Sequence, residues 1–102
     1  MKKLTLIAHA DVEQVLSDVL RGTDQVTGFT FTRVEGHGAQ DEHDPALSAR
    51  DRVVGYTPHV RVDILLEDAD VDEVLAALRS GGCGVAGRGI YWVTAVHSFG
   101  RL

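Results

Sequence analysis

The sequence predicts a single α+β domain with the element order β-α-β-β-α-β, and three observations support this prediction. First, residues 10–22 and 69–81 repeat one another, with six of thirteen positions identical at an offset of 59. Second, both repeats space their apolar residues as an amphipathic helix does. Third, a stretch with strand character stands before and after each repeat. The chain therefore consists of two related halves in tandem.

In the first half, the stretch LTLIA at residues 4–8 predicts the first strand, and FTFTRVE at residues 29–35 predicts the second. The helix between them has an Asp at its expected start, Asp11, and a glycine at its expected end, Gly22. Its apolar stripe consists of Val12, Val15, Leu16, Val19 and Leu20.

In the second half, VRVDILLE at residues 60–67 predicts the third strand, with Val60, Val62, Ile64 and Leu66 on one face. The second helix begins after Asp70, with Glu73 placed as in a capping box, and ends at Gly81. Its apolar stripe consists of Val71, Val74, Leu75 and Leu78. The stretch IYWVTAVHS at residues 90–98, rich in aromatic and β-branched residues, predicts the fourth strand.

This order is that of the ferredoxin-like split βαβ arrangement, whose antiparallel sheet has the strand order 4-1-3-2 and carries both helices on one face. The other face of the sheet is left uncovered. Leu65 and several residues of the last strand put apolar side chains there. Because an exposed apolar sheet invites pairing, the sequence predicts an oligomer.

Size and charge restrict the class of protein. The chain has 102 residues, 44% of them hydrophobic, which fits one soluble domain over residues 1–102. A net charge of −5 argues against a nucleic-acid partner. No apolar run approaches the roughly 20 residues that cross a bilayer, and no signal peptide is recognisable, so we expect no membrane insertion and a cytoplasmic location. The single cysteine, Cys83, excludes an internal disulfide.

The topology brings two loops to the same end of the sheet. One is the connection of residues 37–52, and a connection of that length in a compact domain is usually functional. Its His37 and His43, beside several acidic residues, suit a divalent metal such as copper, nickel or zinc, although composition alone favours a solvated polar loop. The other is the glycine-rich stretch 81–89, which forms either an anion-binding nest helped by Arg88 or a helix end followed by tight turns.

With these elements placed, the chain resembles PII-like signalling proteins over nearly its whole length. GFTFTRVEGHG resembles the second strand and the start of the family's T-loop, and GGCGVAGRGIYWV resembles its B-loop entering the last strand. The stretch VRVDILLEDADVDEVLAAL resembles its third strand and second helix. The tyrosine motif that nitrogen-sensing members modify is absent. Gly89 stands about where the family's phosphate-binding lysine stands, with Arg88 beside it.

The resemblance implies a homotrimer with adenine nucleotides (ATP, ADP or AMP) in clefts between subunits, and a T-loop that docks onto a transporter, an enzyme or a regulator. Residue by residue, it carries a ligand-binding role to Gly36, His37, Gly38, Gly87, Arg88 and Gly89, and more loosely to Arg101. The variants GHG and YW are similar to those of proteins linked with heavy-metal efflux systems. The fold is shared with the CutA divalent-cation tolerance proteins.

Three hypotheses about function follow. The first is a trimeric, non-enzymatic regulator that binds a nucleotide or another anion and acts on a partner through residues 37–52. The second is a metal-binding or metal-sensing protein that uses His37 and His43. The third is a small ferredoxin-like enzyme, which the sequence favours least because it places no convincing acid–base or nucleophile–base pair.

Overall fold

The computed structural model describes residues 1–37, 56–80, 85 and 88–102. Two single 3-10 turns, η1 and η2, stand immediately before the two helices. In chain order the elements are β1 (Lys2–His9), η1 (Ala10–Val12), α1 (Glu13–Arg21), β2 (Phe29–Gly36), β3 (Thr57–Leu66), η2 (Asp68–Asp70), α4 (Val71–Ser80) and β4 (Ile90–Ala95).

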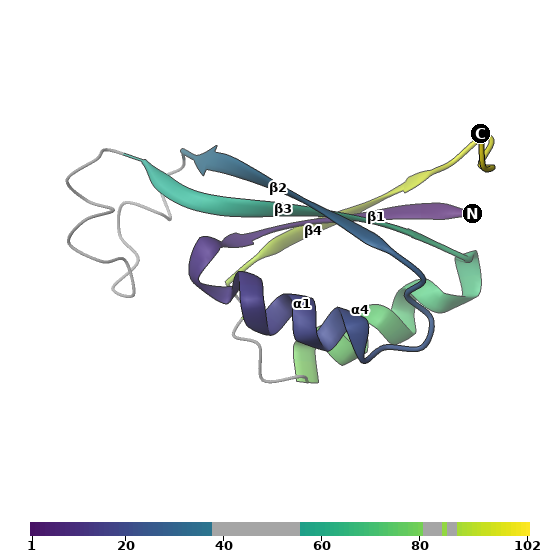
Figure 1. Ribbon diagram of the computed structural model, residues 1–102, viewed down its shortest axis with the longest axis horizontal. Helices are drawn as coiled ribbons and strands as arrows, with labels where there is room; N and C mark the ends of the chain where they lie inside the picture. The colour runs from purple at the N-terminus through teal and green to yellow at the C-terminus, as the bar shows by residue number, and fades with distance from the viewer. Residues whose placement is uncertain (38–55, 81–84, 86–87) are drawn as a thin grey trace.

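The four strands form one antiparallel sheet in the order β2-β3-β1-β4, which confirms the predicted order 4-1-3-2. Figure 1 shows α1 and α4 side by side under one face of this sheet, so the ferredoxin-like prediction is confirmed in its layers as well. β2 and β4 are the two edge strands. Each edge strand follows the helix of its own half but pairs with the central strand of the other half, so the strands of the two halves alternate across the sheet.

The core lies between the sheet and the helices, and the strands supply it from alternate positions. The predicted inward face of β3 is fully buried, from Val60 to Leu66. The predicted stripe of α4 is buried as well. The residues that form this core are Leu4, Leu6, Leu16, Leu20, Val60, Val62, Ile64, Leu66, Val71, Val74, Leu75 and Leu78.

The stripe of α1 differs from the prediction at one flank. Leu16 and Leu20 are completely buried, but Val15 is 43% exposed and Ser17 takes the buried position instead. The reason is a rotation of the helix about its axis, which turns the Leu16 and Leu20 row inward and leaves the preceding residue toward solvent. Gly22 ends α1 as predicted, and its N–H donates to the carbonyl of Asp18.

The predicted role of Asp11 as a helix N-cap is wrong. The chain turns from β1 into η1, and there the backbone N–H of Asp11 donates to Nδ1 of His9 at 3.0 Å. The side chain of His9 therefore caps this turn, in place of the Asp11 carboxylate that we expected to cap the helix. In the second half, Asp70 lies within η2, and the Glu73 carboxylate accepts a hydrogen bond from the Gln25 side chain. The two repeats share the extra turn, which apolar spacing alone does not reveal.

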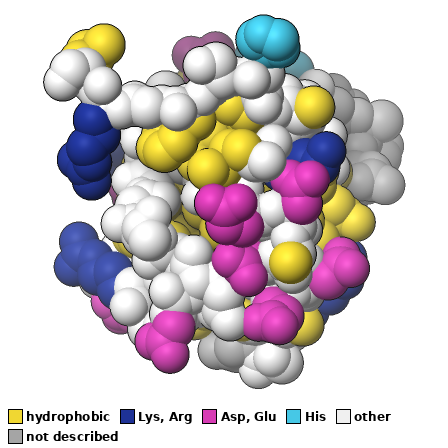
Figure 2. All heavy atoms as spheres, turned by 90° about the vertical axis from the view of Figure 1, so that its right-hand side faces the viewer, with side chains coloured by type: hydrophobic (Ala, Val, Ile, Leu, Met, Phe, Trp, Pro, Cys, Tyr) yellow, Lys and Arg dark blue, Asp and Glu magenta, His cyan; other side chains and the backbone are white. Residues whose placement is uncertain are grey.

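Figure 2 shows the end of the molecule that carries both termini, where hydrophobic side chains lie at the surface next to a group of acidic ones. Phe99 and Leu102 are exposed there. Asp68, at the start of η2, binds the N-terminal amine of Met1 at 2.8 Å. Within the described residues, no helix is both long and apolar enough to span a membrane.

Candidate functional site

The candidate site lies at the end of the sheet away from the two termini, which we call the rim (Figure 1). β1 and β2 finish there, and β3 and β4 begin there. In the strand pairing, His9 stands opposite His59 and Gly36 opposite Thr57. Both segments singled out by the sequence attach to this end of the sheet, as the predicted topology requires.

Gly36 allows the rim to close tightly. A Cβ atom at this position would coincide with the imidazole ring of His59. The ring is held in place because its Nδ1–H donates to the carbonyl of Thr57 at 2.9 Å. Any side chain at residue 36 would displace this ring, so the glycine is explained by close approach.

His9 and His59 form a pair of imidazoles on the uncovered face of the sheet. Their ring centroids lie 6.1 Å apart, with the rings at 61° to each other. Nδ1 of His9 accepts from the Asp11 amide, so its proton is on Nε2 when the ring is neutral. Because His9 and His59 pair with each other across β1 and β3, both lie at the end of the sheet where the 37–52 connection begins.

His37 is the last described residue before the long connection, and its side chain is 65% exposed. Its Nε2 lies 3.4 Å from Oε2 of Glu35, and its ring is 6.2 Å from that of Tyr56. His43 and Gly38 lie outside the described residues, so the predicted pairing of His37 with His43 stays a prediction. The described part of the chain contains no group of three His, Cys, Asp or Glu side chains arranged to hold a metal ion.

The end of the glycine-rich stretch forms a turn. The backbone N–H groups of Arg88 and Gly89 both donate to the carbonyl of Val85, at 3.0 and 3.1 Å. A Cβ atom on Gly89 would lie 3.0 Å from the carbonyl oxygen of Ile7, so this glycine lets the turn pack against β1. At these two amides the chain therefore forms the tight turn rather than an anion nest. Arg88 is exposed, and Gly87 lies outside the described residues.

Arg101 is not brought to the rim within one chain. It is exposed near the C-terminus, which lies at the other end of the sheet in Figure 1. Of the predicted ligand-binding residues, the structure therefore gathers Gly36, His37, Arg88 and Gly89 at one end. Arg101 belongs to the opposite end and can meet a rim only if that rim is a neighbouring subunit's.

The uncovered face of the sheet carries a polar network that sequence analysis missed. Oδ1 of Asp63 accepts from the Thr5 hydroxyl at 2.9 Å, and the Arg61 guanidinium donates to both Asp63 oxygens at 3.1 and 3.3 Å. The same guanidinium lies 5.7 Å from the ring centroid of Trp92. Only the spacing of Arg61 and Asp63, two residues apart in an apolar strand, signalled that they share a face.

This network fixes the ionisation of Asp63. Partial burial of the carboxyl opposes its charged form, but the hydrogen bonds from Arg61 and Thr5, with the charges of Arg61 and Lys3, outweigh burial and lower its pKa. Thr5 is completely buried although it points to the uncovered face. Three strands, β1, β3 and β4, thus contribute to the polar network and its surroundings on this face, which leaves Ile90 and Trp92 exposed, at 61% and 38%.

The whole chain matches known proteins. Residues 1–102 match the family described as "Protein of unknown function (DUF3240)". Among curated relatives, "Nitrogen regulatory protein P-II" of Pasteurella multocida is 31% identical, with 100% of this chain and 91% of that protein covered. "Nitrogen regulatory protein P-II 1" of Escherichia coli is 30% identical over the same shares.

A solved structure agrees with the fold. The crystal structure of a DUF3240 family protein from Shewanella baltica superposes with a TM-score of 0.76 at 21% sequence identity, covering 99% of this chain and 94% of that one. The chain therefore belongs to the DUF3240 family and is a PII-like protein, related over its full length to the nitrogen regulatory P-II proteins.

Proposed function

We propose that the protein is a PII-like, non-enzymatic regulator that assembles as a homotrimer and binds a small anionic ligand in the clefts between subunits. The observation that carries this proposal is that Gly36, His37, Arg88 and Gly89 lie at the same end of the sheet, on its two opposite edges, in a chain similar to nitrogen regulatory P-II proteins from end to end. The two glycines at the rim are both explained by close approach, of the His59 ring at Gly36 and of the Ile7 carbonyl at Gly89. Such packing gives the long connection a rigid base.

The uncovered sheet face supports assembly. Ile90 and Trp92 are exposed on it, and Leu65 is only half-buried. β4 is an edge strand, and all six of its residues are exposed. An apolar face beside an open edge is the surface that an oligomer covers. A trimer would also bring the C-terminal Arg101 of one subunit toward the rim of the next.

An adenine nucleotide is the first ligand to consider. Phosphate groups need cationic or N–H partners, and the rim offers the exposed Arg88 together with the imidazoles of His9 and His59. Arg101 of a neighbour would add a second guanidinium. The residues therefore suit an anion, with fewer fixed positive charges than a lysine at Gly89 would give. We expect modest affinity for ATP, ADP or AMP.

The connection of residues 37–52 is proposed as the output element, the T-loop. His37 stands at its root, beside Tyr56 and within a few residues of the tight contact between Gly36 and His59. A ligand that binds the rim differently in two loop arrangements would shift the balance between them. The partner that reads the loop is proposed to be a transporter or another regulated protein.

Calorimetry with ATP, ADP and AMP tests the ligand. We expect heat of binding with at least one of them at micromolar to millimolar concentrations, and weaker binding by Arg88→Gln. The matched control is Arg33→Gln, an exposed arginine on β2 that we do not place in the site. Absence of heat with all three nucleotides would remove the nucleotide from the proposal.

Divalent metal binding is the alternative, and the contact between His37 and Glu35 favours it because an imidazole and a carboxylate are two ligand types for such ions. Here His37 and His43 would bind copper, nickel or zinc. The test is a titration of the His37→Ala, His43→Ala double variant with each ion. Metal affinity equal to that of the unchanged protein would exclude this site.

A further inference from the structure

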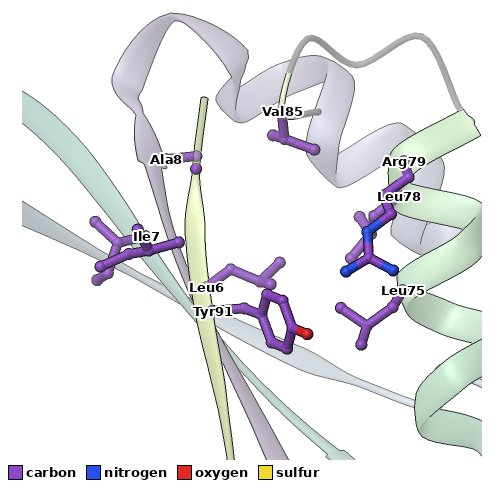
Figure 3. Close-up of a pocket in the computed structure, with 10 residues that line it drawn as sticks. Leu6, Ile7, Ala8, Leu75, Leu78, Arg79, Val85 and Tyr91 are labelled. Carbon is purple, nitrogen blue, oxygen red and sulfur yellow. The ribbon is translucent and has the colours of Figure 1, made fainter. Parts of the chain in front are cut away.

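A cavity of about 170 Å³ opens between α4 and the edge strand β4, on the helix side of the sheet (Figure 3). Its floor and walls are apolar, because Leu6, Ala8, Leu75 and Leu78 are all buried core residues that turn one side toward it. The half-buried Val85 closes one end, held there by the two hydrogen bonds from the turn at Arg88 and Gly89.

Two polar side chains stand at the mouth of this cavity. The Arg79 guanidinium comes from α4 and lies 5.6 Å from the ring centroid of Tyr91 on β4. In Figure 3 both groups point across the opening, toward one another. Tyr91 is 47% exposed, although its alternation with Trp92 directs it toward the helices. The mouth therefore offers one fixed positive charge and one phenol hydroxyl above an apolar hollow.

Two arginines on the strands have a carboxylate partner. Arg33 is paired with Glu13 at 3.2 Å, and Arg61 holds Asp63. Among the residues that the structure describes, no carboxylate pairs with Arg79. Its contact with Tyr91 orients the guanidinium without neutralising it. A cation held at the mouth of an apolar cavity is complementary to a ligand with an apolar body and one anionic group.

The volume of the cavity limits the size of the ligand's apolar part. A cavity of about 150 Å³ lined by aliphatic side chains is large enough to bind benzene. The present cavity is slightly larger and is open at the arginine. We propose that it is a second ligand site, which takes a small monocarboxylate with a ring or chain of about six carbons, its carboxylate on Arg79 and Tyr91 and its body against Leu75 and Leu78.

This site goes beyond the proposed regulatory function, because it lies on the opposite face of the sheet from His9 and His59. The two sites nevertheless meet where the N–H groups of Arg88 and Gly89 donate to the carbonyl of Val85, because Val85 and Gly89 line the cavity and Arg88 lies at the rim. Either site can fail experimentally without the other.

Ligand-observed NMR with benzoate and with benzyl alcohol on the full chain tests the proposal. We expect benzoate to bind at millimolar concentrations. Arg79→Gln should weaken benzoate binding about tenfold, since one charge-assisted contact is lost, and leave benzyl alcohol unaffected. Arg33→Gln is the matched control and should change neither. Acetate, which keeps the charge and lacks the body, should not bind.

A second variant tests the apolar part. Leu75→Phe places extra volume in the cavity and should abolish binding of benzoate and benzyl alcohol alike, while the heat of nucleotide binding to the rim is unchanged. Should Leu75→Phe fail to fold, the exposed Arg79→Gln still decides the question. Benzoate that does not bind at all, or that binds equally to the Arg79→Gln and unchanged proteins, would overturn the assignment.

Discussion

The two halves of the molecule have the same elements but finish their edges differently. At the edge of the first half, Phe29 and Phe31 of β2 pack against the core in an edge-to-face pair with centroids 5.5 Å apart. Arg33 on the same strand binds Glu13 of α1. At the edge of the second half, Tyr91 of β4 lines a cavity beside α4.

This difference shows which positions of a repeated sequence can vary between the two halves and so acquire a function. The helices and central strands of both halves fill the same core, and several of their apolar positions correspond. The edge strands contact the core on one side only, so their side chains are free to differ. One edge is filled and ion-paired, and the other keeps a hollow with an arginine that has no carboxylate partner in the described chain.

The largest expected difference in stability is between substitutions of one buried helix residue in each half. Leu20→Ala should lower the free energy of unfolding by about 3 kcal/mol, because Leu20 is completely buried in filled surroundings. Leu75→Ala should cost about 2 kcal/mol or less, because Leu75 already borders a cavity. Urea denaturation at one fixed protein concentration measures both. Equal costs would mean that the second edge is as tightly packed as the first.

The edge aromatics give the next contrast. Phe31→Ala removes a half-buried ring that packs against the core and should cost about 2 kcal/mol. Tyr91→Ala removes a ring that is 47% exposed and should cost about 1 kcal/mol. The same denaturation experiment compares them. A larger loss from Tyr91→Ala would contradict the description of β4 as the open edge.

We expect the stability of the protein to depend on pH through Asp63, which lies at the centre of the sheet and not at either edge. Its pKa is lower in the folded protein than in the unfolded chain, so its ionised form favours folding. This stabilisation is complete above the ordinary carboxyl pKa of about 3.9 and is lost as the pH falls through the lowered value. Asp63→Asn should cost about 1 kcal/mol at neutral pH.

Denaturation at a series of pH values checks this expectation. The difference between Asp63→Asn and the unchanged protein should shrink as the solution is acidified below about pH 4. A difference that stays constant from neutral to acid pH would show that the contacts with Arg61 and Thr5 do not depend on the charge of Asp63.

The smallest expected effect on stability concerns Arg33 on the edge strand β2 and Arg79 on the helix α4. Arg33→Gln should lower stability by about 0.5 kcal/mol, because its ion pair with Glu13 is largely exposed. Arg79→Gln should leave stability nearly unchanged, because Arg79 has no carboxylate partner in the described structure. Paired denaturation curves compare them, and a clear loss from Arg79→Gln would indicate a structural role for this residue.

Much of the fold was predictable because its signals are local and repeated. The two amphipathic stripes and the alternation in β3 identified the elements, and the tandem repeat identified the topology. The errors arose where the backbone makes short-range choices that spacing does not record. Val15 was placed inside because apolar spacing does not determine how α1 is turned about its axis, and Asp11 was named as a cap because η1 was not foreseen.

The site was predictable only as far as connectivity determines it. Strand order alone places Gly36, His37 and Gly89 at one end of the sheet. The contact of Gly36 with His59 could not be foreseen, because it depends on a ring orientation set by a hydrogen bond to Thr57. The cavity beside Arg79 was missed because a hollow is defined by what neighbouring side chains leave unfilled.

The clefts that the proposed function requires exist only between subunits. The mass of the particle in solution, measured by sedimentation equilibrium, is therefore the most direct test. A particle of three times the 11.0 kDa chain mass is what the account predicts. A stable monomer over the same concentrations would leave the rim without an opposing surface and would contradict it.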